Sequence, residues 1–226
     1  MRGIILAGGT GTRLDPLTRI TNKHLLPVYD RPMIYYPIEQ LVGAGIDRIM
    51  IVTGGNHAGE FLRLLGNGSA FGLKHLDYAY QERAGGIAEA LGLAEYFAAG
   101  EPVVVMLGDN IFERSIAPAV SRFSERPRGA CILLADVDNP AAYGVAEMDG
   151  QRLVRIIEKP AVPPSRLAVT GVYLYDSRVF DLVRLLRPSG RGELEITDVN
   201  NRYLELGELN YERAEGYWAD CGESID

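Results

Sequence analysis

A glycine-rich segment stands directly after the first apolar run of the chain. Residues 4–7 are Ile-Ile-Leu-Ala, and residues 8–13 read GGTGTR. Glycines allow backbone amides to approach phosphate oxygens, and Arg13 adds a forked cation suited to bidentate contact. The segment lacks the third glycine of a dinucleotide-binding loop, because Leu14 stands there, and it lacks the Gly-Lys-Ser/Thr of a P-loop. A phosphate cradle and a simple tight turn both fit this pattern.

Three charged residues elsewhere in the chain could act on phosphate groups. Lys23 lies in a proline-rich stretch, residues 10–32, that cannot form a long helix, so it is either a site residue or a solvated loop lysine. Asp109 follows the apolar run of residues 103–107, where a hard cation such as Mg²⁺ would meet phosphates. An Asp-Asn turn is the simpler interpretation of that position. Asp220 is far along the chain, and only the fold could bring it close.

Strand-like and helical segments alternate through the first half of the chain. We expect strands over residues 3–7, 48–52, 75–80 and 103–107, and helices over residues 33–42, 57–65 and 87–97. This alternation predicts an α/β fold with a doubly wound, mainly parallel, Rossmann-like sheet. Ligands of such sheets bind at the carboxyl ends of the strands. The residues expected at that edge are 8–13, 53–56, Gln81 and 108–110, which predicts one crevice.

The second half of the chain has a different pattern. Shorter strand-like segments cover residues 132–137, 144–148, 153–158 and 168–175, and helical segments cover residues 177–186 and 195–205. No repeat or linker divides the sequence. We therefore predict a single domain over residues 1–226, with a nucleotide-binding half over about 1–137 and a substrate-binding lobe over about 138–226.

The composition excludes several classes of protein. The 226 residues include 23 Lys+Arg and 30 Asp+Glu, giving a net charge of −7, and 47% are hydrophobic. These are globular values, and the acidic balance argues against non-specific binding to nucleic acid or membranes. No apolar run approaches a membrane span and no signal peptide is evident, so we expect a cytoplasmic protein. Cys131 and Cys221 form no metal-binding or disulfide pattern.

Several short motifs occur in the order found in a known family. The segments GGTGTRL, KHLLPV, PMIYYP, LGDN, YGV, EKP, AVTG and RGELEITD stand at residues 8–14, 23–28, 32–37, 107–110, 143–145, 158–160, 168–171 and 191–198. Together they resemble the sugar-nucleotide pyrophosphorylases, and most closely the members that use dTTP and α-D-glucose 1-phosphate. The resemblance runs from Gly3 to about Gly222. It implies an inserted sugar-binding lobe in the second half.

The resemblance implies a reaction and a set of site residues. A glucose 1-phosphate oxygen would attack the α-phosphorus of dTTP in line, so that dTDP-glucose forms and pyrophosphate leaves. Such chemistry asks mainly for positioning and charge neutralisation. By similarity, the residues that hold the nucleotide are Gly8, Gly9, Gly11, Thr12, Arg13, Gln81 and Gly86. The residues that act on the reacting phosphates are Arg13, Lys23, Asp109 and Lys159, and those that bind Mg²⁺ are Asp109 and Asp220.

The resemblance also implies a sugar site. Its residues are Asn110, Tyr143, Gly144, Glu158, Lys159, Val169 and Trp218. His24 stands where longer members often carry glutamine, and we interpret it as structural. The chain ends at Asp226, before the helical segment that carries an allosteric site in longer members, so weak or absent feedback is expected. The family resemblance further implies a homotetramer or homodimer.

Other functions remain possible at this point. The same chemistry with UTP or with a related sugar 1-phosphate is the nearest alternative, and uracil differs from thymine by only one methyl group. A catalytically silent, sugar-nucleotide-binding regulatory subunit is another, although Arg13, Lys23, Asp109, Lys159 and Asp220 are all present. A nicotinamide oxidoreductase is disfavoured, since the third glycine of its loop is missing.

Overall fold

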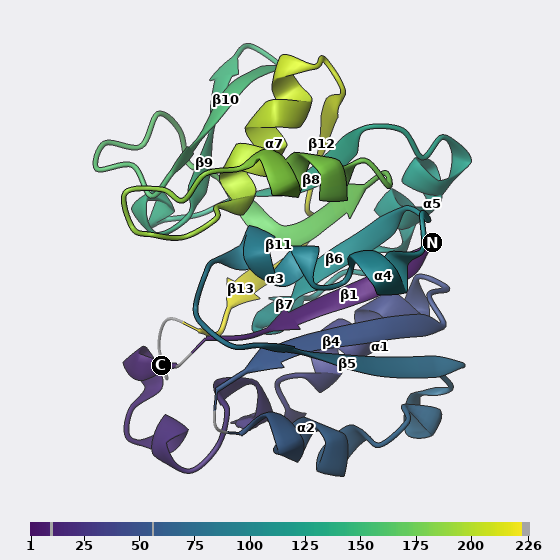
Figure 1. Ribbon diagram of the computed structural model, residues 1–226. Helices are drawn as coiled ribbons and strands as arrows, with labels where there is room; N and C mark the ends of the chain where they lie inside the picture. Colours follow the sequence, from purple (N-terminus) through teal and green to yellow (C-terminus); the bar gives the residue numbers. More distant parts are fainter. Residues whose placement is uncertain (10, 56, 223–226) are drawn as a thin grey trace.

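A mixed sheet of nine strands forms the centre of the molecule (Figure 1). The computed structural model describes residues 1–9, 11–55 and 57–222. In the first half β1 (Arg2–Ala7) pairs in parallel with β4 (Arg48–Gly54) and β6 (Val103–Leu107), and β4 pairs in parallel with β5 (His75–Gln81). The predicted doubly wound sheet is thus confirmed in the half where strands and helices alternate.

The strands of the second half extend this sheet in the antiparallel sense. Strand β11 (Leu167–Tyr175) runs antiparallel to β6, to β8 (Ala130–Asp136) and to β9 (Gly144–Asp149). Strand β10 (Arg152–Glu158) follows β9 as a hairpin, and β12 (Leu209–Arg213) pairs in parallel with β8. Strand β6 therefore has one parallel neighbour and one antiparallel neighbour. Its continuous apolar sequence reflects burial of both faces under helices, which does not depend on the direction of the neighbours.

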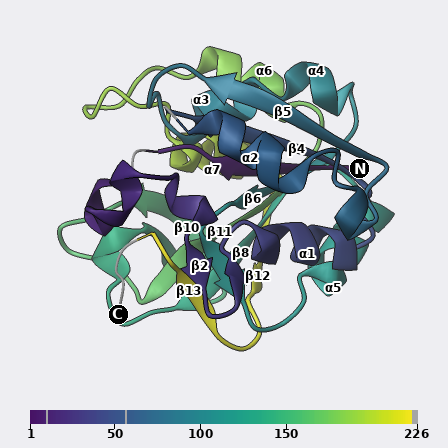
Figure 2. The same ribbon diagram turned by 90° about the horizontal axis from the view of Figure 1, so that it is seen from below.

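Helices cover both faces of the sheet (Figure 2). One face packs against α3 (Ile87–Gly92), α4 (Glu95–Ala98), α6 (Val179–Leu185) and α7 (Ile196–Glu205). The other packs against α1 (Tyr35–Gly43), α2 (Ala58–Leu65) and α5 (Ala117–Glu125). The single helix predicted over residues 87–97 is two helices, because the chain leaves helical geometry at Ala94. Helix α5 was not predicted, although Pro118 in its first turn is a typical start signal.

The long proline-rich stretch after β1 forms short turns, as predicted. It contains the 3-10 turns η1 (Thr12–Leu14), η2 (Leu17–Arg19) and η3 (Lys23–Leu25), followed by the two-residue strands β2 (Pro27–Val28) and β3 (Arg31–Pro32). Two further 3-10 turns are η4 (Ser69–Phe71) and η5 (Pro140–Ala142). A separate ribbon pairs β7 (Asn110–Phe112) with β13 (Trp218–Asp220). None of the helices in the described ranges combines the length and apolar character needed to cross a lipid bilayer.

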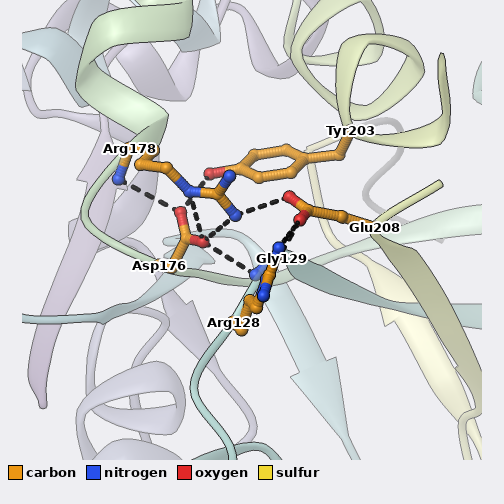
Figure 3. Close-up of polar contacts among 6 residues, drawn as sticks. All are labelled: Arg128, Gly129, Asp176, Arg178, Tyr203 and Glu208. Carbon is orange, nitrogen blue, oxygen red and sulfur yellow. Dashed lines mark hydrogen bonds and ion pairs between the residues drawn. The ribbon is translucent and has the colours of Figure 1, made fainter. Parts of the chain in front are cut away.

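A buried carboxylate ties together the elements of the second half (Figure 3). Asp176, just after β11, accepts hydrogen bonds from the Tyr203 hydroxyl of α7 at 2.7 Å and from the Gly129 amide before β8 at 2.7 Å. The Arg178 guanidinium contacts Asp176 at 2.5 Å and Glu208 at 2.5 Å. Burial opposes ionisation of Asp176, but the hydrogen bonds from Arg178, Tyr203 and Gly129 hold its pKa below the usual value.

Replacing Asp176 by asparagine should lower the free energy of unfolding by about 3 kcal/mol at neutral pH, because Arg178 loses the negative charge that it faces and an NH₂ group takes the place of one of the two acceptor oxygens. The folded pKa is depressed, so this stabilisation is present above the unfolded pKa of about 4 and is lost as the pH falls through the folded pKa. Chemical denaturation between pH 3 and pH 7 measures it. A variant whose stability matches that of the wild type at pH 7 would contradict this role.

Candidate active site

A cavity of about 240 Å³ lies at the carboxyl ends of β1, β5 and β6, where the sequence predicts a crevice. The predicted site residues in its wall are Gly8, Gly9, Lys23, Gln81, Gly86 and Asp109. His24 and Glu193, to which the sequence assigned no binding role, also line it. Thr10 of the glycine-rich loop and Asn56 lie outside the described residues. A larger groove of about 1030 Å³ between β10, α7 and β12 contains none of the predicted site residues.

Lys23 is held in the cavity wall by the residues on either side of it. The Asn22 side-chain oxygen caps η3 by accepting from the His24 amide at 3.0 Å, and it also contacts His24 Nδ1 at 2.7 Å. Since one oxygen accepts from the amide, the ring nitrogen facing it must carry its proton. Asn22 and His24 are both buried, at 5% and 1% exposure. The turn between them directs Lys23 Nζ onto the Asp109 carboxylate.

The Lys23–Asp109 pair is largely shielded from solvent, with side-chain exposures of 15% and 12%. Burial alone would raise the pKa of Asp109, but the Lys23 charge and the hydrogen bonds from Lys23 and Asn110 keep its pKa below the ordinary value. Burial lowers the pKa of His24 to about 3; the Asp109 charge opposes this lowering, and the Lys23 charge adds a smaller lowering of its own. His24 is therefore neutral at physiological pH, so its ring adds no charge beside the Lys23–Asp109 pair.

The short β7–β13 ribbon brings Asp220 to Asp109. Asp220 pairs with Asn110 in the ribbon, and the Cys221 amide donates to the Asp109 carbonyl at 2.8 Å. A Cβ atom at Gly222 would lie 2.6 Å from Asp109 Oδ2, 2.7 Å from Lys23 Nζ and 3.0 Å from Asp220 Oδ1. The two carboxylates and the ammonium group thus surround one glycine. The fold thus brings together the side chains of Lys23, Asp109 and Asp220, which the sequence predicted only as individual candidates.

Gln81 and the glycines form the opposite end of the cavity. The Gln81 Nε2 group donates to the Gly86 carbonyl at 3.3 Å, and a Cβ atom at Gly8 would lie 3.1 Å from Gln81 Oε1. The sequence interpretation placed Gly86 among the residues that hold the nucleotide. The structure adds another reason for this glycine: its φ is 100°, and a Cβ atom there would lie 2.4 Å from the Leu194 carbonyl oxygen.

A second group of predicted residues adjoins Asp109 on the side away from Gln81. Asn110 is 1% exposed, and its side-chain nitrogen donates to Asp109 Oδ1 at 3.1 Å. Its side-chain oxygen accepts from Trp218 Nε1 at 2.7 Å and from the Gly171 amide at 2.8 Å. Tyr143 packs against Trp218 edge to face, with ring centroids 5.2 Å apart. The Asn110 amide therefore connects this group to the Lys23–Asp109 pair.

Glu158 is held at the end of β10 by residues of the second half. Thr197 Oγ1 donates to Glu158 Oε2 at 2.5 Å, and Arg191 lies 3.6 Å from Glu158 Oε1. A Cβ atom at Gly144 would lie 3.1 Å from Thr197 Oγ1 and 3.4 Å from Glu158 Oε2, so this glycine leaves room for the contact. Thr197 and Arg191 belong to the RGELEITD motif. This motif contributed to the family resemblance, but the sequence indicated no role for its residues.

The remaining predicted residues are placed as follows. Lys159 has an uncommon positive φ of 41° for a residue with a side chain, and its amide donates to the Tyr143 carbonyl at 2.9 Å. Val169 lies in β11 and packs in the hydrophobic core. Gly11 adopts φ 62° at the start of η1, where a Cβ atom would lie 2.7 Å from Thr18 Cγ2. Thr12 and the exposed Arg13 follow on η1.

The chain matches a known protein family over nearly its full length. Residues 2–226 match the family described as nucleotidyl transferase. The chain belongs to the nucleotidyl transferase family. It is 49% identical over 236 residues to the glucose-1-phosphate thymidylyltransferase of Actinoplanes sp., covering 100% of this chain and 77% of that protein. It is 46% identical to the enzyme of the same name from Neisseria meningitidis, covering 98% of this chain and 78% of the relative.

Solved structures give the same result for this nucleotidyl transferase. A crystal structure from Bacillus anthracis, assigned as a glucose-1-phosphate thymidylyltransferase in complex with sucrose, matches with a TM-score of 0.95 and 51% identity. The match covers 100% of this chain and 91% of that one. A UDP-glucose pyrophosphorylase complexed with UDP-glucose matches with a TM-score of 0.84 at 23% identity, which supports the fold alone.

Nucleotidyl transferases are in general metal-dependent, and the carboxylates of this member suit a hard cation. Asp109 and Asp220 both direct an oxygen toward Gly222. Within the described ranges, no group of three or more His, Cys, Asp or Glu residues could hold a metal by itself. A cation here would need further oxygens from substrate phosphates and water, which is the usual situation for Mg²⁺.

The nucleotidyl transferase site contains residues that sequence reasoning missed. Glu89 and Thr197 each form a side-chain hydrogen bond with a predicted site residue, Gln81 and Glu158 respectively. Asn22 contacts the backbone amide and the ring of His24, beside Lys23. Asn22 could have been recognised, because asparagine is a preferred N-cap and turn residue whose side chain bonds the backbone amide two residues further on. The contacts of Glu89 and Thr197 depend on how the chain folds around them.

Replacing Asn22 by alanine should slow nucleotidyl transfer about ten- to a hundredfold, because the turn that carries Lys23 loses the acceptor for both His24 donors. The turnover number should fall more than KM rises, which steady-state kinetics measures. Asn67→Ala is the matched control, since it removes a similar side-chain cap from the Ser69 amide on the surface. Equal turnover in Asn22→Ala and Asn67→Ala would contradict a positioning role.

Proposed function

We propose that this nucleotidyl transferase transfers a thymidylyl group from dTTP to α-D-glucose 1-phosphate, forming dTDP-glucose and pyrophosphate. The observation that carries the proposal is the meeting of Lys23, Asp109 and Asp220 around Gly222, beside a glycine-rich loop and a base-sized cavity. The names of the relatives that are 45–49% identical supply the substrates. The silent regulatory subunit is disfavoured, because such a protein has no need to hold a buried Lys–Asp pair at the cavity.

In the proposed reaction the protein positions two phosphates and neutralises their charge. The amides of residues 8–12 and the Arg13 side chain hold the triphosphate and then the leaving pyrophosphate. Lys23 Nζ binds the α-phosphate and the attacking phosphate, and Lys159 binds the sugar phosphate. A preformed cation in a shielded site stabilises the charge of the transition state more strongly than one in water. The reaction is an in-line displacement without a covalent enzyme intermediate.

Mg²⁺ fits the proposed site, held by Asp109 and Asp220. When bound, it would supply Lewis-acid stabilisation of the phosphate oxygens. Asp109 is ready for this role because the Lys23 charge and the Asn110 hydrogen bond keep its carboxyl group ionised. Asn110 also limits how far the carboxylate can turn, since its own amide is fixed by Trp218 and Gly171.

The two ends of the site would receive the base and the sugar. Gln81 offers an oxygen to the N3–H group of thymine or uracil, with Gly8 and Gly86 close to the ring. The sugar would lie near Tyr143, Gly144, Glu158, Val169 and Trp218, with Glu158 accepting from hydroxyl groups. This arrangement underlies the proposed division into a nucleotide half, residues 1–137, and a sugar half, residues 138–226. The homotetramer or homodimer stays a prediction.

Pyrophosphate release with a panel of nucleotides tests the proposed substrates. We expect release with dTTP that requires both glucose 1-phosphate and Mg²⁺, and that stops when EDTA removes the metal. Faster release with UTP would keep the mechanism and change the substrate, because the two bases differ by one methyl group worth roughly 1 kcal/mol. Absence of release with every nucleotide and with several sugar 1-phosphates would contradict the enzymatic function.

Removing either partner of the Lys23–Asp109 pair should reduce turnover about a hundredfold or more, because each acts on the charge of the transition state. Lys23→Ala and Asp109→Asn are the variants, measured by pyrophosphate release at saturating substrates. Lys74→Ala is the matched control, since Lys74 forms an ion pair with Asp47 at the surface. Turnover within a few-fold of the control in either variant would overturn that residue's assignment.

A further inference from the structure

The hydrogen bonds around Gln81 fix which end of its side-chain amide faces the cavity. One end lies 3.3 Å from the Gly86 carbonyl oxygen and 3.2 Å from Glu89 Oε1. Both neighbours can only accept hydrogen bonds, so the NH₂ group must lie there. The amide oxygen is then turned toward Gly8, where a Cβ atom would lie 3.1 Å away. Gln81, Gly8 and Gly86 all line the 240 Å³ cavity, so the cavity receives an acceptor from Gln81.

Glu89 is itself held in position on the first turn of α3. Arg83 donates to Glu89 Oε2 from Nε at 3.3 Å and from Nη2 at 3.2 Å, which leaves Oε1 for Gln81. The carboxylate lies over Gly85, where a Cβ atom would be 2.1 Å from Oε2. Any other residue at position 85 would displace it. The Glu89 side chain is 22% exposed, so water competes only in part for its oxygens.

We propose that Glu89 is a positioning residue that sets base selectivity by fixing the orientation of the Gln81 amide. An inward-facing oxygen accepts from the N3–H group of thymine or uracil. Cytosine presents an acceptor at N3, so the two lone pairs would face each other. The inference deepens the proposed function, because it assumes that the base binds beside Gln81.

Without an acceptor at position 89, the Gln81 amide can rotate by half a turn and present its NH₂ group to the cavity. The Gly86 carbonyl still favours the original orientation, so the selectivity should fall without disappearing. Glutamine at position 89 keeps an oxygen that can accept from Gln81, and it should preserve the selectivity. A purely structural role for Glu89 would not distinguish glutamine from a residue of similar length that lacks an acceptor.

The test compares two pyrimidines of equal ring size in wild type, Glu89→Met and Glu89→Gln. We measure kcat/KM for dTTP and dCTP, and dissociation constants for dTDP and dCDP by calorimetry in the absence of sugar phosphate. We expect the preference for thymine to fall about tenfold in Glu89→Met and to stay within about twofold of wild type in Glu89→Gln. Glu95→Met is the matched control, because Glu95 pairs with Arg184 at the surface.

A thymine preference in Glu89→Met equal to that of wild type would overturn the role of Glu89 and leave the proposed reaction intact. If wild type shows no turnover with any nucleotide but the dissociation constants change as predicted in the variants, the proposed reaction is rejected and the role of Glu89 is supported. If Glu89→Met does not fold, the proposal is tested by the binding of N3-methyl-dTDP, which lacks the N3–H group, to the wild-type protein. Binding at least tenfold weaker than that of dTDP supports the inward-facing acceptor, and equal binding overturns the proposal.

Discussion

The buried ion pair between Lys23 and Asp109 is the constraint on which the site depends. Removing two charges from water is costly unless both are paired and their remaining hydrogen-bonding positions are used. The residues are 86 positions apart in the sequence, so only a defined fold can hold them together. Asn110 donates to the second Asp109 oxygen, and the neighbouring His24 ring is kept uncharged by its burial. The result is one cation and one anion in fixed positions at the edge of the sheet.

The sheet explains why the pair lies where substrates can reach it. Strands β1 and β6 are adjacent and parallel, so the glycine-rich loop and Asp109 emerge side by side at their carboxyl ends. Strand β11 then joins the second half of the chain to β6, which brings the Gly171 amide to Asn110. The predicted nucleotide side and the predicted sugar side are therefore connected through one asparagine next to the charged pair.

Sequence reasoning could predict the parts of this arrangement that depend on local pattern. The alternation of helices and strands indicated the parallel half of the sheet, and the apolar run of β6 indicated a strand that is buried on both faces. The prolines between residues 10 and 32 indicated a loop without a long helix. Those predictions depend on backbone propensities and burial, which are expressed over short windows of sequence.

The parts that sequence reasoning missed depend on contacts between distant residues. Strands β7 and β13 have three residues each, too few for a periodic pattern, yet their pairing brings Asp220 to Asp109. The Gln81 side chain has both a donor group and an acceptor group. In the folded chain its NH₂ group donates to the Gly86 carbonyl and to Glu89, which the sequence alone does not reveal. The close approach of Leu194 to Gly86 likewise follows only from the fold.

The central claim is that the Lys23–Asp109 pair and Asp220 form the place where the metal and the reacting phosphate meet. The most direct measurement is a crystal structure with Mn²⁺ in place of Mg²⁺ and with dTTP bound, in which anomalous scattering locates the metal. The account predicts a metal peak between Asp109 and Asp220, with the α-phosphate beside Lys23 and the base against Gln81. Metal and nucleotide bound together in the larger groove between β10, α7 and β12 would contradict it.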